Sequence, residues 1–326
     1  MITLRVVAAL ALPLLGFCGN SFSQSYPTKP VTVIVPSGAG GAADLVARII
    51  TRALETETKQ PFVVINQAGA TNTIGIRTVV TAPPDGYTLL ISTATSSLAT
   101  SAVFVKDLPF DVVKDLQPVS MIGDASSVLV VNNSVPAKDL SEFIKLIRAS
   151  PGKFNYGATS IGSVGHMHME SLKQAAKLDM MPVFYKQTSQ LLPDLIAGRI
   201  QAWITPIPAV ISNINSGGVR ALATTGLSRA GLLRQAPMIS ETAELKGFSL
   251  LSVYAMFTRA GIPKPTLDRL NELTRKVVES PQVKTQLSAQ GVDAMSSDPQ
   301  AVRDVLVQYI ARWAALVKAV GISVEE

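Results

Sequence analysis

The sequence predicts an α/β protein built from two domains, and three observations lead to that prediction. Segments rich in β-branched residues alternate with amphipathic segments along most of the chain, as strands alternate with helices. A length of 326 residues corresponds to roughly two domains of ordinary size. A hydrophobic content of 47% with only 16% charged residues can fill two cores, and it excludes a disordered chain.

The first 23 residues are predicted to be a signal peptide rather than part of the fold. The apolar run from Val6 to Cys18 follows Arg5 and is shorter than the roughly 20 residues that span a bilayer. Small residues lead to an expected cleavage site between Ser23 and Gln24. A buried N-terminal helix and a lipoprotein anchored through Cys18 remain as alternatives. Cleavage would remove the only cysteine, so we expect an exported, soluble and thiol-free mature chain.

The first part of the chain contains four predicted strands. Each is a short run of β-branched or aromatic residues, and the third follows a Pro-Asp-Gly turn at 84–86. Between the first two strands, Leu45, Ile49 and Ala53 have the spacing of one helix face. The predicted strands are 31–35, 61–65, 87–91 and 128–131, and the predicted helix is 42–56.

The later part continues the alternation and ends in long helices. Pro151 and Gly152 stop one helix, Gly198 ends another, and prolines lie at the starts of the last two. The predicted strands are 154–156, 181–184, 200–204 and 219–223. The predicted helices are 141–149, 166–177, 189–197, 265–280 and 299–320.

This alternation predicts parallel sheets made of βαβ units. Ligands of open α/β sheets lie beyond the carboxyl ends of the strands, so we expect function in the loops that follow them. No low-complexity linker interrupts the chain, and we therefore expect the two domains to be joined by strands that cross between them.

The loop after the first strand has the composition of an anion-binding turn. Gly38-x-Gly40-x-x-Ala43 matches the dinucleotide fingerprint, but the next strand ends in Asn66 rather than in the acidic residue that holds a ribose. We therefore do not expect a dinucleotide. Backbone N–H groups at a helix start still attract an anion, although a tight turn that merely needs glycine is the alternative.

Two further loops are rich in hydroxyl groups. Ser92–Ser97 follows the third strand, and Gly157–His166 opens a later helix. Such residues often only cap helices. Their hydroxyls also donate hydrogen bonds to carboxylates, and two such loops in different parts of the chain suggest two walls of one anion site.

Several other classes of function are disfavoured. Ser160 lacks the preceding glycine of a nucleophile elbow. His166 and His168 lie two residues apart on one helix and point to different faces, so packing or capping is preferred over a metal site. The pI is near 9.4, but the basic residues are scattered and aromatics make up only 6%, which disfavours nucleic acid. We expect no catalytic residue, no cofactor and no metal.

These motifs together resemble the tripartite tricarboxylate transporter substrate-binding proteins, also called the Bug family, over nearly the whole mature chain. The resemblance rests on the order of several motifs rather than on any single one. They are Pro36-Ser-Gly-Ala-Gly-Gly-Ala-Ala-Asp44, Pro83-Pro-Asp-Gly-Tyr-Thr-Leu-Leu90, Pro109-Phe-Asp111, Lys114-Asp115, Pro151-Gly-Lys-Phe-Asn-Tyr156, Gly162-Ser163 with His166, Tyr185-Lys186, Asp194-Leu195 and Ala197-Gly198.

The resemblance implies a type II periplasmic binding protein with two α/β domains and a ligand cleft between them. Residues 24–125 with 226–326 would form the first domain, and residues 126–225 the second. It implies a monomeric periplasmic receptor that captures a small carboxylate and delivers it to membrane components of a tripartite transporter. By matched position, the ligand-binding residues would be Ser37, Ala39, Gly40, Gly41, Thr93, Thr95, Ser96, Ser160, Gly162, Ser163, His166, Tyr185, Thr205 and Pro206.

The chain departs from the family's pattern at two places. Ser37 stands where the family usually has Phe, and Thr205-Pro206 stands where members often carry Asp-Asn. The second change removes a partner for an amino group, so a plain carboxylate or a neutral compound is favoured over an amino acid. Two alternative functions remain open, a binder that signals to a membrane sensor kinase and an exported hydrolase that uses Ser160 or Ser163.

Overall fold

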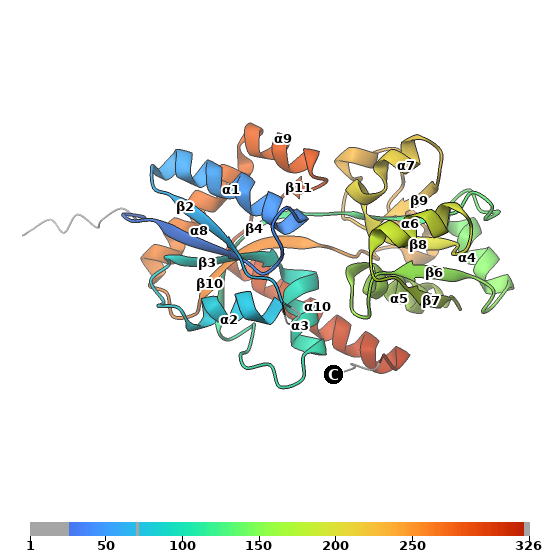
Figure 1. The fold of residues 1–326 in the computed structure, drawn as a ribbon, viewed down its shortest axis with the longest axis horizontal. Coiled ribbons are helices and arrows are strands. Elements are labelled where there is room, and N and C mark those ends of the chain that lie inside the picture. Colours follow the sequence, from blue (N-terminus) through green and yellow to red (C-terminus); the bar gives the residue numbers. More distant parts are fainter. Residues whose placement is uncertain (1–25, 70–71, 323–326) are drawn as a thin grey trace, which may run out of the picture.

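The computed structural model describes residues 26–69 and 72–322. Two α/β units lie side by side, each built around its own sheet (Figure 1). The predicted signal peptide and its cleavage site lie outside the described residues. Within the described part of the chain, no helix is both long enough and apolar enough to cross a membrane.

The first unit is a six-stranded sheet with the order β11-β4-β10-β3-β1-β2. Its strands are β1 (Val31–Val35), β2 (Phe62–Asn66), β3 (Thr88–Thr93), β4 (Leu116–Asp124), β10 (Val253–Arg259) and β11 (Asp293–Ala294). Its helices are α1 (Ala42–Thr58), α2 (Thr73–Thr81), a π-helix (Ala94–Leu98), α3 (Ala99–Phe104), α8 (Lys264–Glu279), α9 (Pro281–Ala289) and α10 (Pro299–Val320). One face of the sheet packs on α1 and α8, and the other packs on α2, α3 and α10.

The second unit is a five-stranded sheet with the order β7-β6-β8-β5-β9. Its strands are β5 (Ser127–Val131), β6 (Asn155–Ala158), β7 (Met181–Phe184), β8 (Ala202–Pro206) and β9 (Arg220–Thr224). Its helices are α4 (Leu140–Ala149), α5 (Val164–Ala176), α6 (Thr188–Ile196) and α7 (Ile211–Asn215). Short 3₁₀ turns follow at Ile207–Ala209, Gly231–Leu233, Ile239–Glu241 and Ala243–Leu245. Helices α4 and α5 cover one face of the sheet, and α6 covers the other.

The prediction of parallel sheets is wrong for β10 and β11 in the first sheet, where β11 pairs antiparallel with β4, and for β5 in the second. Strand β10 pairs antiparallel with β3 and β4, and β5 pairs antiparallel with β8 and β9. Only Ala125 and Ser126 separate β4 from β5, so the chain passes from one sheet into the other without a helix. Strand β5 enters the second sheet directly from the first, so it runs opposite to the strands that the βαβ units of the second sheet provide. Parallel pairing would need a crossover connection.

The sequence patterns located most elements but missed the crossing strand β4 and its neighbour β10. Strand β7 and helix α10 have their predicted bounds, and the predicted helix 166–177 begins two residues earlier at Val164. Strand β4 contains Pro118, Ser120 and Gly123, which obscure a strand pattern. Helices α2, α3 and α9 were also missed, because they are short and contain β-branched residues or glycine.

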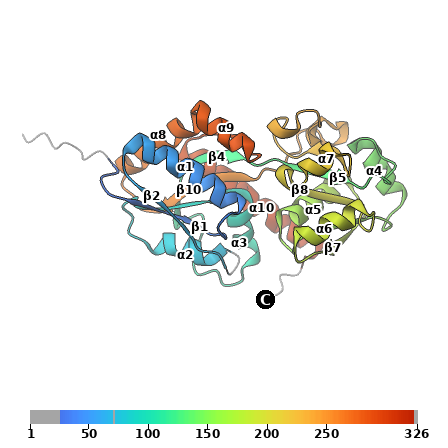
Figure 2. The same cartoon turned by 45° about the horizontal axis from the view of Figure 1, so that its top comes forward.

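Helix α5 joins the two units where they face each other. Its Met167 belongs to the apolar cluster of the first unit, together with Leu98 and Trp313. The ring of His168 lies 6.2 Å from the ring of Trp313, which is on α10. In both views α10 runs from beside α3 towards α5 (Figures 1 and 2). The second unit therefore touches the first through a buried helix face as well as through the strands that cross.

The close approach of α5 to β8 generates a stability prediction. A Cβ added to Gly165 would lie 2.5 Å from the carbonyl oxygen of Ile204, and backbone cannot yield as a flexible side chain can. We expect Gly165→Ala to lower the free energy of unfolding by about 1–3 kcal/mol, measured by urea denaturation. Gly218→Ala is the matched control, because its nearest contact would be an ordinary 3.5 Å. Equal midpoints for the two variants would contradict this account of α5 packing.

Candidate functional site

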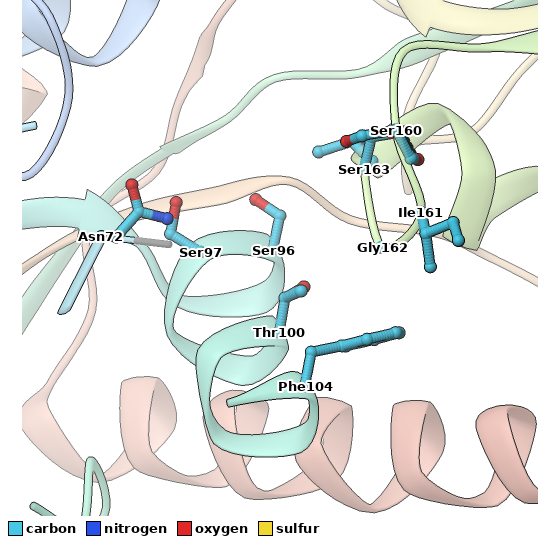
Figure 3. A pocket seen from close by; sticks show the side chains of 10 residues that line it. Asn72, Ser96, Ser97, Thr100, Phe104, Ser160, Ile161, Gly162 and Ser163 are labelled. Atoms are coloured by element: carbon cyan, nitrogen blue, oxygen red, sulfur yellow. Dashed lines mark hydrogen bonds between the residues drawn. The ribbon is translucent and has the colours of Figure 1, made fainter. Parts of the chain in front are cut away.

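A cavity of about 510 Å³ lies between the two units and collects side chains from both (Figure 3). One wall comes from the π-helix and α3, and the other from the loop that precedes α5. Four residues predicted from the sequence, Ser96, Ser160, Gly162 and Ser163, come together here. The full lining consists of Asn72, Ser96, Ser97, Thr100, Phe104, Ser160, Ile161, Gly162, Ser163 and Val164.

The first wall is held by threonines that lie behind it. Thr93 Oγ1 accepts hydrogen bonds from the backbone N–H of Ser97, at 3.0 Å, and from the hydroxyl of Ser96, at 2.6 Å. Thr95 is buried; its Oγ1 accepts from Val253 N, and its carbonyl accepts from Trp313 Nε1 at 2.8 Å. Thr93 and Thr95 do not line the cavity, and they fix the π-helix that presents the two serines. Such π-turns occur often at functional sites.

The second wall is a tight loop fastened to α5. Ser163 donates to the carbonyl of Ser160 through both its backbone N–H, at 3.2 Å, and its hydroxyl, at 2.8 Å. Gly162 has φ +74°, a left-handed conformation that favours glycine, and its N–H donates to His166 Nδ1 at 3.2 Å. The imidazole therefore acts as an acceptor, and burial lowers its pKa and so favours the neutral form that this hydrogen bond requires.

The cavity combines free polar groups with an absence of charge. The side chains of Asn72, Thr100 and Ser160 have no hydrogen-bond partner within the described residues, and the Ser97 hydroxyl accepts from Thr93 but can still donate. None of the described lining residues is ionisable. Neutral donors on two facing walls can bind an anion or a polar group, and hydrogen bonds to a charged acceptor are about twice as strong as neutral ones.

The glycine-rich loop after β1 lies outside this cavity, at the end of α1 that faces the second unit (Figure 1). Of its predicted ligand-binding amides, Gly40 N–H donates to Asp44 Oδ2 at 2.9 Å and Gly41 N–H donates to Gly38 O at 3.4 Å. The amides of Ser37 and Ala39 have no acceptor among the described residues, and the Ser37 hydroxyl is buried without a partner.

Asp44 organises the same loop. Besides the Gly40 amide, its carboxylate accepts from Arg48 Nε at 2.9 Å and from Asn66 Nδ2 at 3.1 Å, and Asn66 also reaches Ser37 O. Burial alone would raise the pKa of Asp44, but the hydrogen bonds from Arg48, Gly40 and Asn66 outweigh it and lower the pKa. Asn66, which argues against a dinucleotide, thus has a local structural role.

The four remaining predicted site residues lie elsewhere on the second unit. His166 lines a neighbouring cavity of about 530 Å³, and its ring packs 5.2 Å from that of Phe184. Tyr185 follows β7 and donates to Asp194 Oδ2 at 2.9 Å; burial, followed by that hydrogen bond, raises its pKa to about 12. Thr205 is buried in β8, and Pro206 is exposed at its end.

Several lining residues were not predicted from the sequence. Among them, Ser97 belongs to the hydroxyl-rich segment 92–97, so the composition of that segment could have identified it as a candidate ligand-binding residue. Thr100 and Phe104 lie on α3, which sequence patterns did not predict, and Asn72 immediately precedes the unpredicted α2. No local sequence pattern identifies these residues, because only the packing of these helices brings them to the loop at 160–164.

His168 has a different environment from His166, as the prediction of different helix faces required. It is buried against Trp313, and its Nδ1 has no hydrogen-bond partner in the part of the chain that the structure describes. Burial, and then the charge of Arg312, lowers its pKa to about 3. Across residues 26–69 and 72–322, no three His, Cys, Asp or Glu side chains gather in a way that could hold a metal ion.

Comparison with known proteins identifies what this chain is similar to. Residues 46–322 match the family described as tripartite tricarboxylate transporter family receptor. Protein BugT of Bordetella pertussis is 31% identical over 323 residues, which cover 98% of this chain and 98% of BugT. The resemblance seen in the sequence motifs is thereby confirmed.

Solved structures give the same result. Rpa4515 of R. palustris, solved with adipate, is 30% identical with a TM-score of 0.75 and covers 91% of this chain and 99% of its own. MatC from Rhodopseudomonas palustris, solved with bound malate, is 26% identical with a TM-score of 0.69 and covers 90% and 100%. These likenesses, and that to the periplasmic binding protein BugD, confirm the predicted two-domain fold class.

The Asp44 network generates a pH-dependent prediction. We expect Asp44→Asn to destabilise the protein by about 1–3 kcal/mol near neutral pH, because the new amide turns donors towards Arg48 and Gly40. The folded-state pKa of Asp44 is lowered, so its stabilisation is present above the usual value of 3.8 and is lost as the pH falls below it. Urea unfolding of both proteins from pH 7 down to pH 2 measures this; a difference that stays constant would contradict it.

The buried His168 generates the second prediction of this section. Its folded-state pKa lies below the usual 6.5, so the folded state binds fewer protons than the unfolded state between these values. Stability is therefore lost as the pH falls from 6.5 towards 3. We expect His168→Leu to remove this loss, which has a slope of up to about 1.4 kcal/mol per pH unit. Thermal unfolding at pH 8, 6, 5 and 4 tests it. The two proteins should differ little at pH 8 and progressively below 6.5, and parallel curves would refute the assignment.

Proposed function

Because the chain belongs to the tripartite tricarboxylate transporter receptor family, we propose that it captures a small carboxylate in the cleft between its two domains and delivers it to a membrane transporter. The observation that carries the proposal is the facing pair of donor walls. Polar groups from the π-helix, α3, the loop at 160–163 and Asn72 before α2 converge on one cavity, and the side chains of Asn72, Thr100 and Ser160 have no protein partner within the described residues.

The solved relatives and the donors that line the cavity both support a carboxylate ligand. Rpa4515 and MatC were solved with adipate and malate, which are both carboxylates. In this chain, Asn72, Thr100 and Ser160 would supply neutral donors to such a group. The amides of Ser37 and Ala39 would add a second set if the cleft closed over the ligand, as the matched family positions imply.

Domain closure would occur about the strands that cross. We propose that residues 24–125 with 226–326 form one domain and residues 126–225 the other, although the 3₁₀ turns between Gly231 and Leu245 pack against the core of the second sheet. At this junction Ala125 N donates to Ser252 O at 3.1 Å, and Ser127 N donates to Thr225 Oγ1 at 3.0 Å. Few residues take part in the crossing, which is the arrangement that permits hinge motion around a bound ligand.

We further propose a periplasmic, monomeric receptor that binds without catalysis and needs no cofactor, metal or nucleic acid. The imidazole of His166 uses Nδ1 to accept from Gly162 and so is committed to the loop backbone rather than to a serine hydroxyl. Light scattering of residues 24–326 tests the monomeric state, and retained ligand can be identified by mass spectrometry of the purified protein.

Ser160 provides the direct test of the proposed site. We expect the mature chain to gain thermal stability with one or more small carboxylates, and Ser160→Ala to weaken that ligand by roughly 10- to 100-fold in calorimetric titration, because a hydrogen bond to a charged group is lost. Ser212→Ala, an exposed serine on α7, is the matched control and should bind like the parent chain. Absence of any carboxylate response, or equal binding by both variants, would exclude this site.

A further inference from the structure

His166 lies between the proposed ligand cavity and the adjoining cavity of about 530 Å³. It is part of the lining of the second cavity and not of the first, but its Nδ1 accepts the N–H of Gly162, which lines the first, at 3.2 Å. The centre of its ring is 6.4 Å from that of Tyr156 and 5.2 Å from that of Phe184. The imidazole therefore supports the ligand-facing loop from behind.

The amide of Gly162 is the point at which this loop is fastened to the ring. Elsewhere in the loop, Ser163 donates to the carbonyl of Ser160 through both its N–H and its hydroxyl, so those groups are already used. Among the described residues, the N–H of Gly162 has the imidazole as its only acceptor. Figure 3 shows Ser160 and Ser163 on this loop, across the cavity from the wall that carries Ser96. The imidazole thus helps to place one of the two walls.

The hydrogen bond to Gly162 requires a neutral ring. A neutral imidazole has one donor and one acceptor nitrogen, and because Nδ1 accepts, the proton lies on Nε2. The imidazolium carries a proton on both nitrogens, so its Nδ1–H would point at the N–H of Gly162 and the two donors would repel each other. Protonation of His166 therefore breaks the attachment of the loop that carries Ser160.

Ionisable groups surround the ring from its own helix, from β6 and from the segment between α5 and β7. On α5, Lys173 Nζ lies 2.7 Å from Glu170 Oε1, and Tyr156 on β6 donates its hydroxyl to the same oxygen. Asp179 lines the same cavity, to which β7 and the end of α10 add only uncharged residues among those described. Burial lowers the pKa of His166, the charge of Glu170 raises it, and that of Lys173 lowers it, so that it lies below the usual 6.5.

We propose that His166 is a positioning residue of the ligand site, and that protonation of its ring weakens carboxylate binding. The proposal rests on the proposed function and adds a regulation to it, namely binding near neutral pH and release in acid. Because the bound state needs the unprotonated ring, affinity should fall by up to about tenfold for each pH unit below the pKa of the ligand-free protein. His166 acts through Gly162 rather than by contact with the ligand.

Two substitutions at position 166 separate the hydrogen bond from the proton. His166→Asn offers an amide oxygen that accepts from Gly162 and does not titrate, whereas His166→Leu has no acceptor. Calorimetric titration with malate and adipate from pH 8 to pH 5 compares them with the parent chain. We expect the Asn variant to bind within about threefold of the parent at pH 8 and to lack its loss in acid. The Leu variant should bind about tenfold or more weakly throughout, because an amide is left without its acceptor.

The ligand carboxylates also take up protons, with pKa values of about 4, but they do so for every variant. The difference between the parent and His166→Asn therefore isolates the imidazole. Phe184→Leu is the matched control, because it changes the packing against the ring and leaves both ring nitrogens in place; it should keep the pH dependence of the parent. Loss of that dependence in the control would assign it to ring packing and overturn the proposal.

A measurement without ligand tests the positioning step by itself. The other histidine of the chain, His168, has a pKa lowered to about 3 by burial, so His166 is the imidazole expected to titrate between pH 8 and pH 5. In nuclear magnetic resonance spectra of isotopically labelled protein, the ring nitrogens of His166 and the amide of Gly162 should shift with one midpoint. The shift of the amide should be absent from His166→Asn.

The outcomes distinguish this inference from the proposed function. An amide of Gly162 that ignores the titration of the ring would overturn the inference, even if neither malate nor adipate binds or His166→Leu does not fold. Equal pH profiles of binding in the parent and in His166→Asn would also overturn it, and both results leave the proposed function intact. A lack of response to every small carboxylate at pH 8 would instead overturn the proposed function, and this regulation with it.

Discussion

The packing of α5 against the first domain is the interaction on which the candidate site depends. At one end of its first turn, His166 holds the amide of Gly162 and thereby the second wall. One and two residues further, Met167 and His168 are buried beside Trp313, whose indole N–H donates to the carbonyl of Thr95 behind the first wall. A single helix therefore sets the separation of the two walls. A shift of α5 would move the loop at 160–163 relative to the π-helix, which makes it the element whose movement would change the cavity.

Hydrogen bonding divides the polar residues of this region into two groups. The side chains of Thr93, Thr95 and Asp44 are buried, and their oxygens accept hydrogen bonds from the backbone and from neighbouring side chains. Thr100 and Ser160 have similar chemistry but keep their hydroxyls free within the described structure, because they face the cavity. Buried polar groups must be satisfied within the fold, whereas those at a binding surface can be satisfied by a ligand. This division separates residues that build the site from residues that would touch a ligand, although both kinds lie in the same short loops.

The crossing of the chain between the sheets explains both the mixed topology and the position of the cavity. Strand β5 follows β4 after two residues, and this direct passage forces it to run against β8 and β9. The same passage places the two sheets side by side with the loops of both facing one another. The low charge of the chain suits this arrangement, since neutral donors on opposing loops can hold an anion without burying an unpaired cation.

The sequence alone determined the α/β class, most helices and strands, and the family, because these depend on local periodicity and on motifs that keep their order along the chain. It also selected Ser96, Ser160, Gly162 and Ser163, which line the cavity, although Ser96 lies in the π-helix and not in the loop that the sequence predicted. It could not identify β4 and β10, whose burial comes from neighbouring strands rather than from their own pattern, nor the antiparallel pairing of β5. Nor could it show that Thr93 faces inward while Thr100 and Phe104 face the cavity, because the direction of a side chain is decided by which helix packs behind it. That choice belongs to the tertiary structure, where Trp313 and α5, distant in sequence, fix the orientation of the π-helix and complete the site.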